Sequence, residues 1–177
     1  WVAHHGKHKV EGARGVIEAK YADHPVLRGV GEIFAPSDVY TVKHLDEPKA
    51  KVLVRAAITE TMEPDSPTLH DDPRNQPLQA GIWLHEYTAP NGKRGTSLLT
   101  TMGASVDLES EGLRRVIVNA AFYLLDLEVP EEANVDYVDP FEPTFFSFLP
   151  KTYWEERNLK PADFALGRSP SVGLPGK

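Results

Sequence analysis

The sequence contains no cysteine, which excludes disulfides, a catalytic thiol and the cysteine-based zinc sites. It also has no apolar run close to the ~20 residues that span a bilayer, so we expect no transmembrane helix. Basic residues are in the minority: 19 Lys and Arg against 26 Asp and Glu give a formal net charge of −7. Because no basic block offsets this acidity, nucleic acid is not an expected partner.

The rest of the composition is that of an ordinary globular protein, with 41% hydrophobic and 25% charged residues among 177. A chain of this length can bury roughly 70% of the surface it exposes when unfolded, which is enough for one domain with its own core. The first residue is Trp1 rather than Met. We interpret the chain as part of a longer domain.

The first third predicts short strands at residues 15–19, 38–42 and 51–57, because these segments are apolar or alternating and rich in β-branched residues. Residues 59–78 contain four prolines and several acidic residues. Such a stretch is typical of a long exposed loop, and loops of this length are often functional.

The strongest periodic signal lies between residues 79 and 127. Residues 80–87 alternate and residues 95–101 can return as their partner, with Asn91-Gly92 as the turn, so the pattern predicts a β-hairpin. A helix should follow, capped by Ser105 or Asp107. Its apolar stripe predicts substantial burial and consists of Leu113, Val116, Ile117, Ala120, Ala121 and Leu124, widened by Val118, Phe122 and Leu125.

Residues 130–177 differ in character, with proline-rich sequence and eight of the 16 aromatic residues between Tyr137 and Phe164. Proline at this density interrupts helix and sheet, whereas so many aromatic side chains in a free tail would expose a large apolar surface. We therefore predict an extended arm that lies across a groove of its own domain or of a neighbouring subunit.

The densest group of possible ligand residues is His4-His5-Gly6-Lys7-His8. Imidazoles can transfer protons near neutral pH, contact sugar hydroxyls or bind a metal. His4 and His8 have the spacing of two metal ligands on one helical face, but Gly6 and the lack of a Glu between them fit the helical zinc-protease pattern poorly. A polar sugar site, a metal site and a polar loop with incidental histidines all remain open.

Two further groups carry possible binding residues. Asp38 and Tyr40 are two apart on a predicted strand, so both side chains face the same way and suit hydrogen bonding and stacking on a small polar ligand. The predicted hairpin carries Glu86 and Arg94, and its exit turn from Thr101 to Ser105 leads into a helix N-terminus, where backbone N–H groups favour an anion or polar substrate. For each group the alternative is ordinary strand, turn and surface chemistry.

The order and spacing of several segments resemble the second half of ThuA-like (trehalose-utilisation) domains, most closely the branch found in planctomycete-type bacteria. The resemblance covers roughly residues 1 to 165 and rests on Trp1-Val2-Ala3-His4-His5-Gly6-Lys7-His8, Arg14-Gly15-Val16-Ile17, His24-Pro25-Val26-Leu27-Arg28-Gly29, Pro36-Ser37-Asp38-Val39-Tyr40, Ile82-Trp83-Leu84-His85-Glu86-Tyr87, Gly92-Lys93-Arg94-Gly95, Thr100-Thr101-Met102-Gly103-Ala104-Ser105, Gly112-Leu113-Arg114-Arg115-Val116-Ile117-Val118-Asn119-Ala120, Asn134-Val135-Asp136 and Lys160-Pro161-Ala162-Asp163. Many members have Leu-Gly-His where this sequence has Met102-Gly103-Ala104, so any role of that histidine is absent.

The resemblance implies a three-layer α/β fold of the class I glutamine-amidotransferase-like, flavodoxin-like type, with the N-terminal half missing. Residues 1–129 would be the C-terminal portion of that domain and residues 130–177 the arm. The amidotransferase nucleophile is a cysteine, which this chain lacks. The resemblance also implies a role in disaccharide or keto-sugar utilisation. Export signals are frequent among relatives, which is compatible with a periplasmic or extracellular location but does not assign one.

Two functions follow as hypotheses. In the first, a small sugar binds at a histidine-containing cleft without a cofactor or metal: His5, His8 and Glu86 would act on it, and the contacts would come from His4, Asp38, Tyr40, Arg94, Thr101 and Ser105. In the second, the chain is a non-catalytic module whose aromatic arm holds a homo-oligomer together. The first hypothesis requires the imidazoles and the turn before the helix to meet in space.

Overall fold

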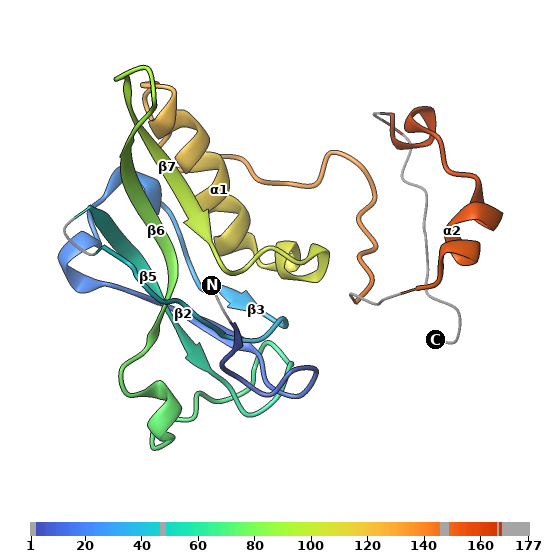
Figure 1. Cartoon of the computed structure of the whole chain (residues 1–177), viewed down its shortest axis with the longest axis horizontal. Helices are drawn as coiled ribbons and strands as arrows, with labels where there is room; N and C mark the ends of the chain where they lie inside the picture. Colours follow the sequence, from blue (N-terminus) through green and yellow to red (C-terminus); the bar gives the residue numbers. More distant parts are fainter. Residues whose placement is uncertain (1–2, 47–48, 146–148, 166, 168–177) are drawn as a thin grey trace.

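The computed structural model describes residues 3–46, 49–145, 149–165 and 167, and its main feature is a curled five-stranded sheet with one long helix against it (Figure 1). The strands are β1 (Ala3–His4), β2 (Ala13–Ile17), β3 (Phe34–Ala35), β4 (Tyr40–Thr41), β5 (Ala50–Ile58), β6 (Gln79–Thr88) and β7 (Arg94–Thr100). The helices are α1 (Glu111–Leu124) and α2 (Lys151–Arg157), with short 3-10 helices η1 (Ala19–Tyr21), η2 (Pro25–Leu27), η3 (Pro73–Asn75), η4 (Ser105–Glu109) and η5 (Pro161–Phe164).

The main sheet has the strand order β3-β2-β5-β6-β7, and every neighbouring pair is antiparallel. In β5 the apolar run is buried on both faces: Leu53 and Val54 belong to the main core and Val52 to the Trp83 cluster. A register irregularity at this point lets the consecutive Leu53 and Val54 both join the main core. The predicted hairpin is confirmed as β6 and β7. Its turn contains Gly92 at a φ of +81°, a backbone conformation that glycine adopts without steric cost.

The expected three-layer, flavodoxin-like α/β fold of the glutamine-amidotransferase type is wrong for this chain. Parallel strands need crossover connections, usually helices, whereas the strands here are all antiparallel. Helix α1 follows β7 and packs on one face of the sheet, and no strand follows it in the described residues. A strand, a turn and a helix look the same in sequence whether the helix begins a crossover or closes an antiparallel sheet.

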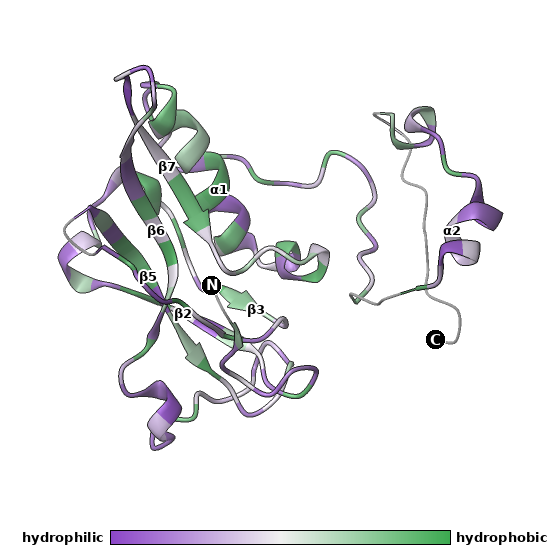
Figure 2. Cartoon of the chain, in the orientation of Figure 1, coloured by the Kyte–Doolittle hydropathy of each residue, from purple (hydrophilic) through white to green (hydrophobic). Residues whose placement is uncertain are grey.

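The main core lies between this sheet and α1, where Ile82 and Val54 meet Leu113 and Val116. Figure 2 shows these hydrophobic stretches on the strand centres and α1, while the hairpin tip and the loop around η3 are hydrophilic. A smaller apolar cluster around Trp83 covers part of the other face. The sheet is therefore buried on both sides only near its middle.

Helix α1 confirms the predicted helix, but its buried face is rotated from the predicted stripe. Leu113, Val116 and Ala120 are buried as expected, whereas Ile117 and Leu124 are exposed. Their place is taken by Asn119, whose side-chain amide donates to the carbonyls of Val26 (3.2 Å) and Arg28 (2.8 Å). The N-cap is Ser110, which accepts from the backbone N–H of Leu113, and not Ser105 or Asp107.

The chain after α1 first crosses the surface of the core and then leaves it. Val129, Ala133 and Val135 are buried, and Arg28 and Arg115 donate to the carbonyls of Val129 and Ala133. Figure 1 shows the chain then running away from the sheet to α2 and η5, which bury none of their residues. No described helix has the length and apolar character to cross a bilayer.

Candidate functional site

The structure brings together His4, His8 and Asp38, three residues from two segments about 30 positions apart in sequence. The Nδ1 atoms of His4 and His8 lie 2.6 and 3.3 Å from the same carboxylate oxygen, Asp38 Oδ2. The two imidazole rings are 4.5 Å apart between centroids. One donor atom from each residue lies within 4.8 Å of the others, so these three side chains could together hold a metal ion.

The Asp38 carboxylate is the most deeply buried part of this cluster, with a side chain 0% exposed. Its second oxygen, Oδ1, has no hydrogen-bond partner among the described residues. Burial raises the pKa of the Asp38 carboxyl above its usual range, and the neighbouring His4 and His8 offset part of this rise. A buried carboxylate with one unsatisfied oxygen is costly, and the imidazoles compensate it incompletely.

The short two-stranded sheet β1–β4 holds the cluster in place. His4 pairs directly with Tyr40 in this sheet, and the two rings lie 5.0 Å apart. The backbone N–H groups of His5 and Gly6 both donate to the carbonyl of Val39, at 2.7 and 3.1 Å. The sequence-predicted sharing of one strand face by Asp38 and Tyr40 therefore becomes a contact of both residues with His4.

His5 points to different partners from its neighbours. Its Nε2 donates to the carbonyl of Arg74 (2.7 Å), so its Nδ1 is the acceptor for the Thr41 hydroxyl at 3.2 Å. Both ring nitrogens are thus engaged in fastening the first residues to the loop that precedes β6. In this geometry the His5 ring holds the chain in place, and its expected action on a substrate stays a prediction.

An ion network that the sequence did not indicate supports the same region. Arg74 makes a bidentate pair with the buried Glu11 (2.7 and 3.0 Å) and also contacts Asp72 at 2.5 Å. Burial alone would raise the pKa of Glu11, but hydrogen bonds from Arg74 and the Lys7 backbone outweigh it and lower this pKa below 4.5. The same guanidinium lowers the pKa of Asp72 to about 2 and has its own pKa raised.

A second buried acid, Asp107, joins the Asp38 segment to the turn before α1. It accepts the Ser37 backbone N–H (3.0 Å) and hydroxyl (2.6 Å), and the N–H groups of Gly103 (2.8 Å) and Ala104 (2.9 Å). The turn predicted to offer its N–H groups to an anionic substrate therefore gives them to a carboxylate of its own chain. Ser105, expected to contact substrate, donates its hydroxyl to the Thr144 carbonyl at 3.1 Å.

A shallow cleft of about 360 Å³ lies between this turn and Tyr40. Its lining residues are Ser37, Tyr40, Thr100, Thr101, Met102, Gly103 and Ala104. Tyr40 lines this cleft, and its ring lies 5.0 Å from the His4 ring, measured between centroids. Burial, together with the negative charges of Asp38 and Asp107, raises the pKa of the Tyr40 hydroxyl, which keeps it a hydrogen-bond donor at neutral pH. The imidazoles therefore lie next to the hollow through Tyr40, but none of them lines it.

Glu86 and Arg94 belong to a different part of the molecule. The backbone N–H of Thr101 donates to the Gly81 carbonyl in β6 (2.9 Å), and the five residue steps from Gly81 to Glu86 span about 17 Å of strand. There Glu86 lies 3.6 Å from Lys51 and 4.0 Å from Arg94, in a separate hollow near the hairpin tip. The structure does not bring Glu86 to the imidazoles that it was expected to orient.

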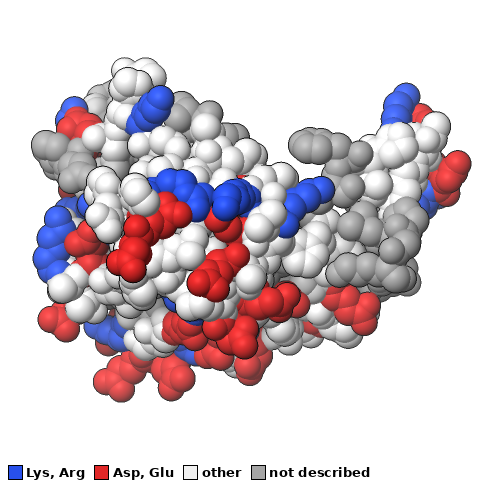
Figure 3. Space-filling model, turned by 90° about the horizontal axis from the view of Figure 1, so that it is seen from below, with Lys and Arg blue, Asp and Glu red and all other residues white. Residues whose placement is uncertain are grey.

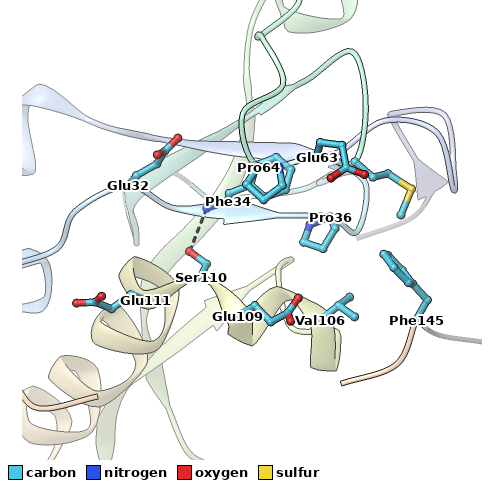
Figure 4. A pocket seen from close by; sticks show the side chains of 11 residues that line it. Glu32, Phe34, Pro36, Glu63, Pro64, Val106, Glu109, Ser110, Glu111 and Phe145 are labelled. Carbon is cyan, nitrogen blue, oxygen red and sulfur yellow. Dashed lines mark hydrogen bonds between the residues drawn. The ribbon is translucent and has the colours of Figure 1, made fainter. Parts of the chain in front are cut away.

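A larger cavity of about 490 Å³ lies between β3, the loop at residues 62–64 and the start of α1 (Figure 4). Its floor is apolar, with Phe34, Pro36 and Val106, and Phe145 approaches from the arm. Four glutamates line it, namely Glu32, Glu63, Glu109 and Glu111. Ser110 also lines the cavity, and its hydroxyl accepts the backbone N–H of Phe34 at 3.1 Å (Figure 4). None of the sequence-predicted site residues reaches it.

Sequence reasoning identified the cluster's histidines, Asp38 and Tyr40, but missed Glu11, Arg74 and Asp107 as parts of the same region. The only local signal for Glu11 is its i,i+4 spacing from Lys7. The sequence predicts Asp107 as a helix cap, because an acidic residue near the start of a helix is typical of that role. Arg74 lies between a proline and an asparagine in the long loop, and nothing in its neighbourhood predicts a partner 63 residues away.

No family model, curated protein or solved structure matches this chain. Its function must therefore be argued from the site itself.

On the face shown in Figure 3, acidic side chains gather below a row of basic ones, so that both signs of charge lie close together.

Proposed function

We propose that this chain binds a small sugar, of the disaccharide or keto-sugar class, in the cleft between Tyr40 and the Thr101–Ala104 turn, and acts on it with the adjacent imidazoles. The observation that carries the proposal is the position of Tyr40, which lines the cleft with Thr101 and whose ring lies 5.0 Å from the ring of His4, the partner of the buried Asp38. A tyrosine face beside hydroxyl donors suits the mixed apolar and polar surface of a sugar.

The chemistry that an imidazole on a buried carboxylate supplies is proton transfer. Asp38 accepts the Nδ1–H of His4, and in that tautomer Nε2 carries the basic lone pair. Such a pair can remove a proton from a hydroxyl, or from a carbon next to a keto group, and return it elsewhere. His8, on the same carboxylate oxygen, is the second candidate for this role.

Ligand binding tests the proposal directly. Titration with disaccharides and with 3-keto-glycosides, followed by calorimetry and ¹H–¹⁵N spectra, should show binding with shifts at Thr101, Gly103 and Ala104. Tyr40→Ala removes the shared wall and should weaken binding at least about tenfold, which corresponds to about 1.4 kcal/mol. His85→Ala, an imidazole in the hairpin-tip hollow, is the matched control. Absence of any sugar binding, or equal binding by both variants, would refute the proposal.

A second candidate function is assembly through the arm. It is favoured by the exposure of Trp154 and Phe164, which are 45% and 58% exposed on segments that bury no residue. Replacing both with serine in the full chain should lower the mass measured by light scattering if these side chains hold subunits together. Truncation at residue 130 is a poorer test, because it would also remove the buried Ala133 and Val135. An unchanged mass would exclude this function.

A further inference from the structure

We propose that His4, His8 and Asp38 form a binding site for one divalent transition-metal ion, with zinc as the natural first probe. The site deepens the function proposed above and rests on it for its role. Its existence rests on geometry alone: two imidazole nitrogens and a carboxylate converge within 4.8 Å of one another. Two histidines and one carboxylate are a ligand set that zinc and other first-row divalent ions accept.

The distances are close to those of a loaded site. Ligands about 2.1 Å from a tetrahedral ion are separated by roughly 3.4 Å from one another. The His8 Nδ1 to Asp38 Oδ2 distance of 3.3 Å already fits, and the corresponding His4 distance of 2.6 Å must open by less than 1 Å. Both histidines are on a segment whose side chains are partly exposed, so a small ring rotation provides that change.

An independent observation points to a ligand at the same place. The Asp38 side chain is fully buried, yet its Oδ1 has no hydrogen-bond partner among the described residues. Buried polar atoms are normally satisfied, and buried charges are usually paired or coordinate metals. A divalent ion between the rings would satisfy this carboxylate more completely than the two imidazoles alone.

The ion would change how the cluster works. A metal ligand must offer a lone pair, so in a neutral imidazole the proton would move from Nδ1 to Nε2 when Nδ1 binds the ion, and the imidazoles would become ligands rather than bases. Three protein ligands leave at least one position open for water or for a sugar oxygen. On the side of Tyr40, that position would polarise a keto or hydroxyl group of a ligand in the cleft.

Metal binding is tested first on the full chain without a purification tag and without sugar. Chelator-treated protein is titrated with Zn²⁺ by calorimetry, and with Co²⁺ by visible absorption. We expect one ion per chain, with the imidazole resonances of His4 and His8 shifting and those of His70 and His85 unchanged. No binding, or shifts confined to other histidines, would overturn the site without any variant being needed.

Variants then assign the ligands. His8→Ala should weaken Zn²⁺ binding at least about 100-fold, beyond the 10–100-fold typical of outer-shell partners. His70→Ala is the matched control, because it removes an exposed imidazole from the loop while the hydrogen bonds made by its backbone remain. Equal affinity in the two variants would overturn the assignment. Asp38→Asn tests the carboxylate, and far-UV circular dichroism verifies its fold.

The metal site and the sugar function fail in different ways. If Zn²⁺ binds one to one and no sugar binds, the metal site holds and the proposed function is refuted. If sugars bind the chelator-treated protein and Zn²⁺ does not bind, the function holds and the metal site is overturned. Sugar affinity that rises when Zn²⁺ is present supports both.

Discussion

The imidazole cluster at β1–β4 and the hairpin tip at β6–β7 carry the same kinds of side chain in very different surroundings. At the cluster, Asp38 is 0% exposed and lies under two histidines. At the tip, Glu86 is 54% exposed and Arg94 84% exposed, with 4.0 Å between them. Water surrounds both charged groups at the tip, whereas at the cluster it reaches the two imidazoles but not the Asp38 carboxylate, so the electrostatic interactions of Asp38 are screened less.

The two regions also differ in what holds their side chains in place. The segments that carry the cluster are held by buried groups: Ser37, next to Asp38, donates to Asp107, and Glu11, three residues after His8, pairs with Arg74. The hairpin tip extends beyond the sheet (Figure 1), and its residues after Leu84 leave the core. A preorganised site needs segments that are held by buried hydrogen bonds, as those around the cluster are.

The largest effect is expected from Asp107→Ala. Four donors from Ser37, Gly103 and Ala104 would lose their acceptor, and three of them are backbone N–H groups that cannot move away. We expect the free energy of unfolding to fall by about 3–4 kcal/mol, as measured by urea denaturation. Glu109→Ala, an exposed acid two residues away, should change it by less than about 0.5 kcal/mol. Equal effects would mean that Asp107 is not the link between the two segments.

Arg74→Ala should have the next largest effect, because it leaves the buried Glu11 carboxylate without its bidentate partner. The free energy of unfolding should fall by about 2 kcal/mol. This is less than the cost of breaking a fully buried pair, because the guanidinium is partly exposed. The same urea experiment measures it. A stability equal to that of the unaltered chain would show that Glu11 is satisfied by Lys7 alone.

Acid pH should reveal the same pair in the unaltered chain. The pKa of Glu11 and that of Asp72 are lower in the folded chain than their usual 4.5 and 3.8, so both carboxylates stabilise the fold above about pH 4.5. That contribution is lost as the pH falls toward the folded values, about 2 for Asp72. Urea midpoints at pH 5, 4 and 3 should therefore decline more steeply in the unaltered chain than in Arg74→Ala. Equally steep declines in the two chains would show that the ion pairs of Arg74 do not cause the loss of stability in acid.

The smallest effect is expected at the hairpin tip. Arg94→Ala removes a guanidinium that is almost entirely in water, so stability should change by no more than about 0.5 kcal/mol. Glu86→Gln should leave sugar binding within about twofold, since Glu86 lies outside the cleft. A tenfold loss of binding in Glu86→Gln would erase the contrast between the two regions and restore Glu86 to the site.

Part of the site was predictable, and the reason is local. Strand alternation predicted that Asp38 and Tyr40 lie on the same side, and both contact His4, although the strand itself covers only Tyr40–Thr41. His4 and His8 were recognised by residue type alone. Their meeting with Asp38 depends on the pairing of β1 with β4, two strands of only two residues each. Such short strands carry no periodicity from which pairing could be inferred.

The sequence by itself determined the hairpin around Gly92, the strand over Ala50–Ile58 and the existence of helix α1, because turn chemistry and apolar periodicity act over a few neighbouring residues. Only the tertiary structure decided that the sheet is antiparallel rather than flavodoxin-like, that Arg74 reaches Glu11, and that Glu86 lies away from the imidazoles. These outcomes depend on which distant segments pack together, and the free energy of that packing is a sum over the whole core that no local pattern contains.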